Sequence, residues 1–92
     1  MDKHYVYILE CSDGTYYTGY TNDLQARIKK HESGEGAKYT RGRSPFTLMF
    51  SECFASKSAA MKEEYRIKRL SRASKERLIR EGIDYEESKE FS

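Results

Sequence analysis

The residues best suited to chemistry in this chain are aromatic hydroxyls, a guanidinium and an imidazole that lie close together in the sequence. Tyr7 and Tyr17 are ten residues apart, and Arg27 and His31 follow within the next fourteen. A guanidinium binds phosphate oxygens through two parallel hydrogen bonds, and an imidazole exchanges protons near neutral pH. Packing rarely requires all of these groups in one short segment, so the mixture indicates phosphodiester chemistry.

Each of these residues also has a purely structural interpretation. At about 100° per residue, Arg27 and His31 border the helix face that Leu24 and Ile28 would bury. A phosphate is one partner for a guanidinium held there, and an arginine stem that covers the edge of the core while its head reaches water is the other. Tyrosine is a good strand former, so simple packing is the alternative for the two tyrosines.

A carboxylate further along the chain is a candidate metal ligand. On the second predicted helix Glu64 lies about 25° from the centre of the apolar face, whereas Glu63 lies about 75° from it. A bare carboxylate there costs several kcal/mol unless it is paired or metal-bound. Lys68, one turn later, offers an ordinary ion pair. The other partner is one Mg²⁺ ion whose remaining ligands are water and substrate phosphate.

Apolar patterns and turn signals predict the elements that position these side chains. Strands are expected over residues 5–10 and 16–20, joined by a tight turn at Asp13-Gly14, and a third strand over 46–54. Helices are expected up to about residue 32, up to about residue 70, and over 75–81 with Gly82 ending the last. The expected caps are Thr21 or Asn22, Ser56 or Ser58, and Ser74. The order β-β-α-β-α-α predicts an α+β fold, a small three-stranded antiparallel sheet flanked by helices.

Length and composition indicate one small domain. The chain has 92 residues, of which 37% are hydrophobic and 35% charged. We expect a single domain over residues 1–83 and a charged, flexible C-terminal tail over 84–92. The sequence has no long apolar run and no signal-peptide pattern, so we expect a soluble, cytoplasmic protein with no membrane partner. Cys11 and Cys53 lack zinc or disulfide spacing, which predicts two buried free thiols.

The distribution of charge says more than the net charge of +2. Basic residues dominate positions 27–43 and 57–80, and acidic residues dominate 84–90. The middle of the chain therefore predicts a cationic face, unless these side chains merely solvate the helices. The glycine-containing loop carries Lys38, Tyr39, Arg41 and Arg43. The basic residues could follow a nucleic-acid backbone while Tyr39 stacks on an unpaired base, and a solvated surface loop is the alternative.

The order and spacing of these motifs resemble the GIY-YIG nuclease superfamily over residues 5–70, and among its members the small, stand-alone, single-domain bacterial type. The resemblance rests on Tyr5-Val6-Tyr7, Tyr17-Thr18-Gly19, Thr21, Leu24-Gln25-Ala26-Arg27, His31, Glu64-Tyr65 and the loop over 36–45. Two positions depart from the family pattern, since Tyr5 replaces the first glycine and Thr18 replaces the isoleucine of the second tripeptide.

The resemblance implies roles for individual residues. It implies that Tyr7 activates water, that Tyr17 positions the water or the phosphate, and that Glu64 is the one protein ligand of a single Mg²⁺ or Mn²⁺ ion. Arg27 would steady phosphoryl charge and His31 would support it. The expected substrate-binding residues are Gly19, Thr21, Lys38, Tyr39, Arg41 and Arg43.

These roles together predict a metal-dependent endonuclease that hydrolyses DNA phosphodiester bonds, structure-directed in repair or recombination. The alternative is a nucleic-acid-binding module of the same fold with little or no cleavage activity, and a third option is an interaction domain whose substrate face is vestigial. Nothing in the sequence recognises a 2′-hydroxyl, so RNA stays open as a substrate. Because enzymes of the family usually take specificity from attached domains, a protein partner could supply it here.

Overall fold

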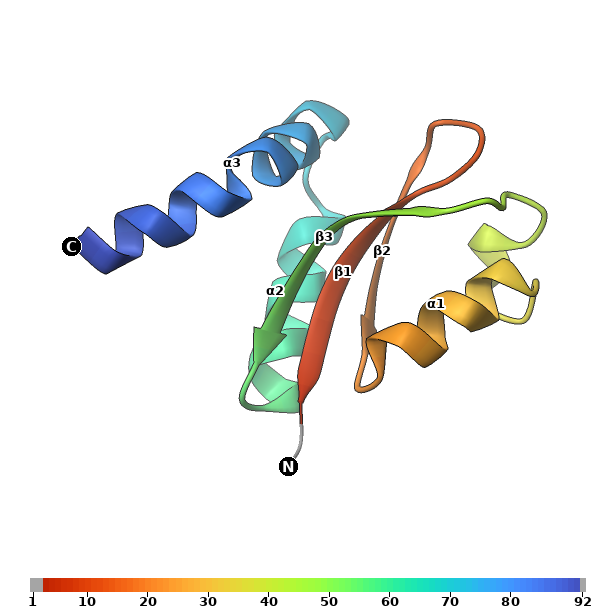
Figure 1. Ribbon diagram of the computed structural model, residues 1–92, viewed down its shortest axis with the longest axis horizontal. Helices are drawn as coiled ribbons and strands as arrows, with labels where there is room; N and C mark the ends of the chain where they lie inside the picture. Colours follow the sequence, from red (N-terminus) through yellow and green to blue (C-terminus); the bar gives the residue numbers. More distant parts are fainter. Residues whose placement is uncertain (1–2, 92) are drawn as a thin grey trace.

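The computed structural model describes the backbone of residues 3–91 and the side chains of residues 3–81. The elements in chain order are β1 (His4–Glu10), β2 (Tyr16–Thr21), α1 (Leu24–Glu32), the 3₁₀ turn η1 (Lys38–Thr40), β3 (Thr47–Phe54), α2 (Lys57–Lys68) and α3 (Arg72–Phe91). Figure 1 shows a sheet with helices beside it. The predicted α+β class and the order β-β-α-β-α-α are therefore confirmed.

The sheet has the strand order β2-β1-β3, and both pairings are antiparallel. Residues 6–9 of the central strand β1 are all fully buried, which explains why this strand is apolar on both faces. Val6 and Ile8 form the main core with Ala60 and Ile67 of α2. Alternate residues of a strand point to opposite faces, so Tyr7 lies on the face away from this core.

The N-caps of the first two helices differ in how well the sequence predicts them. Ser56 caps α2, as predicted, and accepts a hydrogen bond from the Ala59 N–H. The prediction of Thr21 or Asn22 for α1 is wrong, because Asp23 is the cap and accepts from the Ala26 N–H at 3.2 Å. The Thr21 hydroxyl accepts a hydrogen bond from the Asp23 N–H at 3.1 Å, so it stabilises the turn that leads into α1 rather than capping the helix.

The third helix is longer than predicted at both ends. It begins at Arg72, and the Ser71 hydroxyl rather than Ser74 supplies the capping oxygen, accepting from the Ser74 N–H at 3.2 Å. It also continues through Gly82 to Phe91, so the predicted end at Gly82 is wrong. One glycine in a helix costs only about 1 kcal/mol and does not by itself end it. The domain boundary at residue 83 and the flexibility of residues 84–92 stay predictions, and Met1, Asp2 and Ser92 lie outside the described residues.

The structure tests the prediction that Cys11 and Cys53 are both buried free thiols. Both cysteines are free thiols, but only Cys11 is buried, and Cys53 is exposed because it lies on the edge strand β3. The prediction of two buried thiols is therefore wrong for Cys53.

No helix within residues 3–91 has the length and apolar character that crossing a bilayer requires.

Candidate active site

A chain of three hydrogen-bonded side chains, from Tyr7 through His31 to Thr40, lies at the centre of the site. The Tyr7 hydroxyl is 2.8 Å from Nε2 of His31, and Nδ1 of His31 is 2.8 Å from Oγ1 of Thr40. All three side chains are almost completely buried. They come from β1, α1 and η1, so this contact ties the loop after α1 to the sheet.

The hydrogen bond between the Thr40 hydroxyl and the Ala37 carbonyl determines which atoms of Tyr7, His31 and Thr40 carry protons. The Thr40 hydroxyl donates to the Ala37 carbonyl at 2.8 Å, so its oxygen is left to accept from Nδ1–H of His31. Burial lowers the pKa of His31, and the positive charge of Arg27 lowers it further. The imidazole is therefore neutral near pH 7, and its bare Nε2 must accept the proton of the Tyr7 hydroxyl. Tyr7 thus points its proton at a neutral base.

The electrostatic surroundings of Tyr7 connect it with the other predicted site residues. Burial raises the pKa of Tyr7 to about 12, so the phenol keeps its proton at neutral pH. The guanidinium of Arg27 acts in the opposite direction and lowers this pKa, whereas Tyr17 and Glu64 raise it further. These effects require proximity. Tyr7, Tyr17 and His31 are thus in contact, and the charges of Arg27 and Glu64 act on the same phenol.

Aromatic rings extend the site from the buried histidine to the surface. The Tyr17 ring lies 6.3 Å from the Tyr7 ring and 5.2 Å from the His31 ring, because the two strands pair across the turn that joins them. Tyr39 stacks on Tyr17 at 5.9 Å and is 45% exposed. Phe46 adds an edge contact to His31. The exposed Tyr39 ring is therefore connected through Tyr17 with the buried series of hydrogen bonds from Tyr7 through His31 to Thr40, which we call the relay.

Two glycines leave the room that the relay occupies. A Cβ on Gly19 would lie 2.5 Å from the Tyr7 hydroxyl oxygen, and a Cβ on Gly36 would overlap Nδ1 of His31. Atoms that close cannot coexist, so both positions require the absence of a side chain. The family resemblance implies that Gly19 binds substrate, and in the structure Gly19 lies against the Tyr7 hydroxyl. Gly36 was missed as a site residue, because one glycine among several in a loop carries no distinguishing pattern.

Glu64 has the partner that its helical spacing suggested. Its carboxylate lies 3.2 Å from the Lys68 ammonium and is 12% exposed. The neighbouring Glu63 is 21% exposed and engages Arg66 through both oxygens. Glu64 is thus the more enclosed of the two carboxylates, and the one that acts on the pKa of Tyr7.

The side chains available as metal ligands decide whether the site fits the Mg²⁺ or Mn²⁺ ion that the family implies. Among the described side chains, no three His, Cys, Asp or Glu residues cluster closely enough to hold a metal ion on their own. A site made mainly of protein ligands is therefore not formed by this part of the chain. A single enclosed carboxylate such as Glu64 does fit Mg²⁺, which keeps several waters and binds substrate phosphate.

The residues expected to bind substrate fall into two groups. Lys38 and Arg41 are exposed on the loop after α1, where a nucleic-acid backbone could reach them. Arg43 is already engaged, because it forms an ion pair with Asp13 and lies over the Tyr39 ring at 4.6 Å. Thr21 is buried in the turn before α1. Thr40, which orients His31, was missed because nothing distinguishes a single threonine in a loop.

Comparison with known proteins identifies the class to which this fold and site belong. A family model described as the GIY-YIG catalytic domain matches residues 3–77. The chain therefore belongs to the GIY-YIG family, which places it in a superfamily of nucleases.

Two relatives align with this chain over nearly their whole length. A UPF0213 protein of Halobacterium salinarum is 67% identical over 76 residues, covering 83% of this chain and 99% of the relative. A UPF0213 protein of Halalkalibacterium halodurans is 58% identical over 91 residues, covering 98% and 97% of the two chains.

Two solution NMR structures are similar as well. One, of a UPF0213 protein from Bacillus halodurans, has 62% identity and a TM-score of 0.56 over 84% of this chain and 82% of that one. The other, of a protein from E. faecalis, has 40% identity and a TM-score of 0.60 over 87% and 88%.

Proposed function

We propose that this protein is a metal-dependent endonuclease that hydrolyses DNA phosphodiester bonds, directed by the structure of the DNA in repair or recombination. The observation that supports this most is the buried relay from Tyr7 to Thr40, with Arg27 and Glu64 close to the phenol. A phenol that donates to a neutral imidazole places an acid in direct contact with a base. It is well suited to moving a proton.

In the proposed mechanism the relay activates water. The Tyr7 hydroxyl passes its proton to Nε2 of His31 while its oxygen takes a proton from the attacking water. The hydroxide attacks phosphorus, and the 3′ oxygen leaves. His31 keeps Nδ1–H directed at Thr40 throughout, so the cation formed on the ring stays hydrogen-bonded. Relaying the proton avoids a free tyrosinate, which a pKa of about 12 disfavours.

Arg27 and Glu64 act on the phosphate rather than on the proton. Arg27 stabilises the charge that builds on the phosphoryl oxygens. One Mg²⁺ or Mn²⁺ ion held by Glu64 would supply positive charge at the leaving oxygen. Lys68 must release the Glu64 carboxylate for this, which is feasible because Lys68 is 51% exposed and the pair is only partly enclosed.

The substrate strand is expected to cross the exposed end of the aromatic stack. Tyr39 offers a ring to an unpaired base, and Lys38 and Arg41 offer charge to flanking phosphates. Arg43 lies over the Tyr39 ring and donates to the Tyr39 carbonyl, so it supports this aromatic side chain at the surface. RNA remains open as a substrate, the cytoplasm is the expected compartment, and a protein partner is the expected source of specificity.

One observation favours the second candidate function, a nucleic-acid-binding module of the same fold. The Glu64 carboxylate is paired with Lys68, as expected of a carboxylate that serves stability rather than a metal ion. In such a module Glu64→Ala would leave DNA affinity unchanged or increase it, because a negative charge near phosphate is removed.

The deciding experiment is cleavage of labelled duplex, single-stranded, nicked and branched DNA, with matching RNAs, in the presence of Mg²⁺ or Mn²⁺. Glu64→Ala is the test variant, and Glu63→Ala, one residue away on the same helix, is the control. Metal-dependent cuts that disappear in Glu64→Ala and persist in Glu63→Ala support the nuclease and identify its preferred shape. Salt-sensitive binding without any cut would instead support the binding module.

A further inference from the structure

We propose that a pocket beside the candidate active site holds an unpaired nucleobase of the strand being cut, next to the scissile phosphate. The pocket has a volume of about 400 Å³ and is lined by Lys3, Tyr5, Asn22, Asp23, Leu24 and Gln25. It is formed by the start of β1, the turn after β2 and the first turn of α1. That the bound strand is the one being cut rests on the proposed function. That a base binds here rests on the pocket itself.

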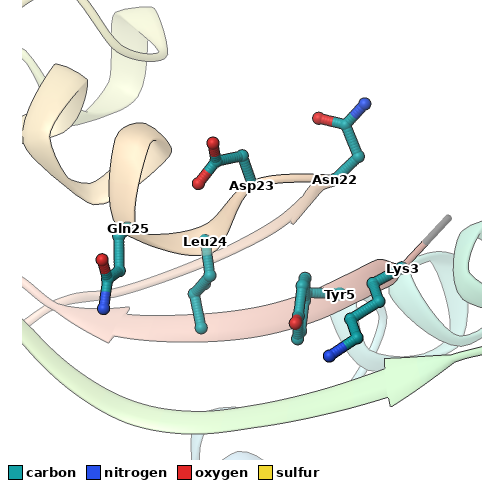
Figure 2. A pocket seen from close by; sticks show the side chains of 6 residues that line it. All are labelled: Lys3, Tyr5, Asn22, Asp23, Leu24 and Gln25. Carbon is teal, nitrogen blue, oxygen red and sulfur yellow. The ribbon is translucent and has the colours of Figure 1, made fainter. Parts of the chain in front are cut away.

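The side chains that line the pocket divide into two sets. In Figure 2 Gln25, Leu24, Tyr5 and Lys3 follow one another along β1 and project to the same side. The side chains of Asn22 and Asp23 project to the opposite side of the turn. The working surface of the pocket is therefore a row that begins with a carboxamide, continues with an apolar and an aromatic group, and ends with an ammonium group.

The position of the pocket relative to the site matches the spacing of nucleotides. Tyr5 and Tyr7 lie on the same face of β1, and two residues of an antiparallel strand span about 6.8 Å. A strand with an unpaired, unstacked base extends by more than the 3.4 Å per nucleotide of stacked DNA, so a single nucleotide can span about this distance. On α1, Leu24 precedes Arg27 by about one turn. A strand whose phosphate meets Arg27 therefore places a neighbouring nucleotide over the pocket.

The chemistry of the row suits a base. The half-buried Tyr5 ring and Leu24 provide an aromatic and an apolar surface on which a base can stack. Gln25 presents a donor and an acceptor together, the combination that pairs with the edge of a base. The exposed Lys3 can meet the phosphate that the base carries. The whole chain contains one glutamine and one asparagine, and both line this pocket.

The charges of the turn argue against a pocket for a bare phosphate. The Ala26 N–H at the start of α1 already donates to the Asp23 carboxylate, so this helix end is capped by the chain itself. The same carboxylate would repel an anion placed against the turn. The neutral row of Gln25, Leu24 and Tyr5 carries no such penalty, so an uncharged base is the better occupant.

The composition of the chain supplies a direct test by ¹⁵N NMR. Only Gln25 and Asn22 have side-chain carboxamides, so their NH₂ signals are the only ones of that kind, and they report on the two sides of the turn. The wild-type protein is titrated in EDTA, without divalent ions, with 5′-phosphorylated DNA trinucleotides. Their middle unit carries adenine, another base or no base. Matching RNA trinucleotides and free nucleoside monophosphates form separate arms.

We expect base-bearing trinucleotides to shift the Gln25 signal more than the Asn22 signal, with adenine binding most tightly because carboxamides pair with it in two hydrogen bonds. Gln25→Leu should weaken base-dependent binding by about tenfold, and Asn22→Ala, which removes the other carboxamide, should not. The inference is overturned if abasic trinucleotides shift Gln25 as much, if Gln25→Leu binds as tightly as wild type, or if free nucleotides bind as tightly as trinucleotides.

This experiment separates the two proposals. It measures binding under conditions in which no metal-dependent cleavage occurs, so a chain that never cuts DNA can still show the base pocket. Conversely, a Gln25→Leu protein that cuts DNA at the wild-type rate but no longer distinguishes base-bearing from abasic trinucleotides would show that the pocket binds the base and that cleavage does not require it. Tighter binding of the RNA arm would identify RNA as the source of the base.

Discussion

Replacing Thr40 by valine tests the proton arrangement at the centre of the site. Thr40 is 1% exposed, and its hydroxyl accepts from Nδ1–H of His31 and donates to the Ala37 carbonyl. Valine has nearly the same shape and removes both bonds. The Ala37 carbonyl keeps the backbone N–H of residue 40 as a partner at 3.0 Å, so Nδ1–H of His31 is the one buried group left without an acceptor.

The expected magnitude follows from that one group. An unsatisfied buried donor costs about 1–3 kcal/mol, and each kcal/mol lowers the melting temperature of a domain of this size by about 4–8 °C. The imidazole can avoid the penalty by moving its proton to Nε2, where it donates to Tyr7 instead of accepting from it. The proposed proton transfer then meets a similar barrier, so cleavage should fall by about tenfold or more.

Three measurements check this prediction. Thermal unfolding gives the loss of stability, ¹⁵N NMR of the imidazole shows which ring nitrogen carries the proton, and single-turnover cleavage gives the rate. Thr40→Ser keeps the hydroxyl and is the matched control, which should retain the wild-type proton position and most of the rate. If Nε2 of wild-type His31 already carries the proton, or if Thr40→Val cuts DNA at the wild-type rate, the relay is refuted.

Three further predictions follow from the same site. Gly19→Ala places a Cβ against the Tyr7 hydroxyl and should lower the free energy of unfolding in urea by about 1–3 kcal/mol; unchanged stability would contradict the close contact. The lowered pKa of His31 means that the unfolded chain binds more protons below about pH 6.5, so stability should fall as the pH drops through that range, and less steeply in His31→Asn. The pKa of about 12 at Tyr7 means that the folded protein holds this proton where the unfolded chain, near pH 10, releases it; stability should therefore fall between pH 10 and 12, and an ultraviolet titration should lose its latest-titrating tyrosine in Tyr7→Phe.

Local patterns predicted what depends on backbone geometry. The two strands follow from runs of aromatic and β-branched residues, and the Asp13-Gly14 turn follows from the need for positive φ at Gly14, where φ is 83°. Antiparallel pairing across that turn then brings Tyr17 near Tyr7. Helical periodicity likewise distinguished Glu64 from Glu63, and the structure has Glu64 as the more enclosed of the two.

Contacts between distant segments escaped prediction because no period encodes them. The sequence by itself determined the order of elements and which of two adjacent carboxylates on α2 is the more enclosed. It determined the buried face of α2 only in part, since Ala60 and Ile67 are buried whereas the apolar residues Met61 and Tyr65 are exposed. Only the tertiary structure decided that η1 folds back so that Thr40 orients His31, and that Gly36 leaves room for that ring. It also decided that Arg43, paired with Asp13, lies over the Tyr39 ring. The path of a loop depends on its closure against the rest of the molecule. Side chains in a loop are therefore assigned partners only when the whole chain has folded.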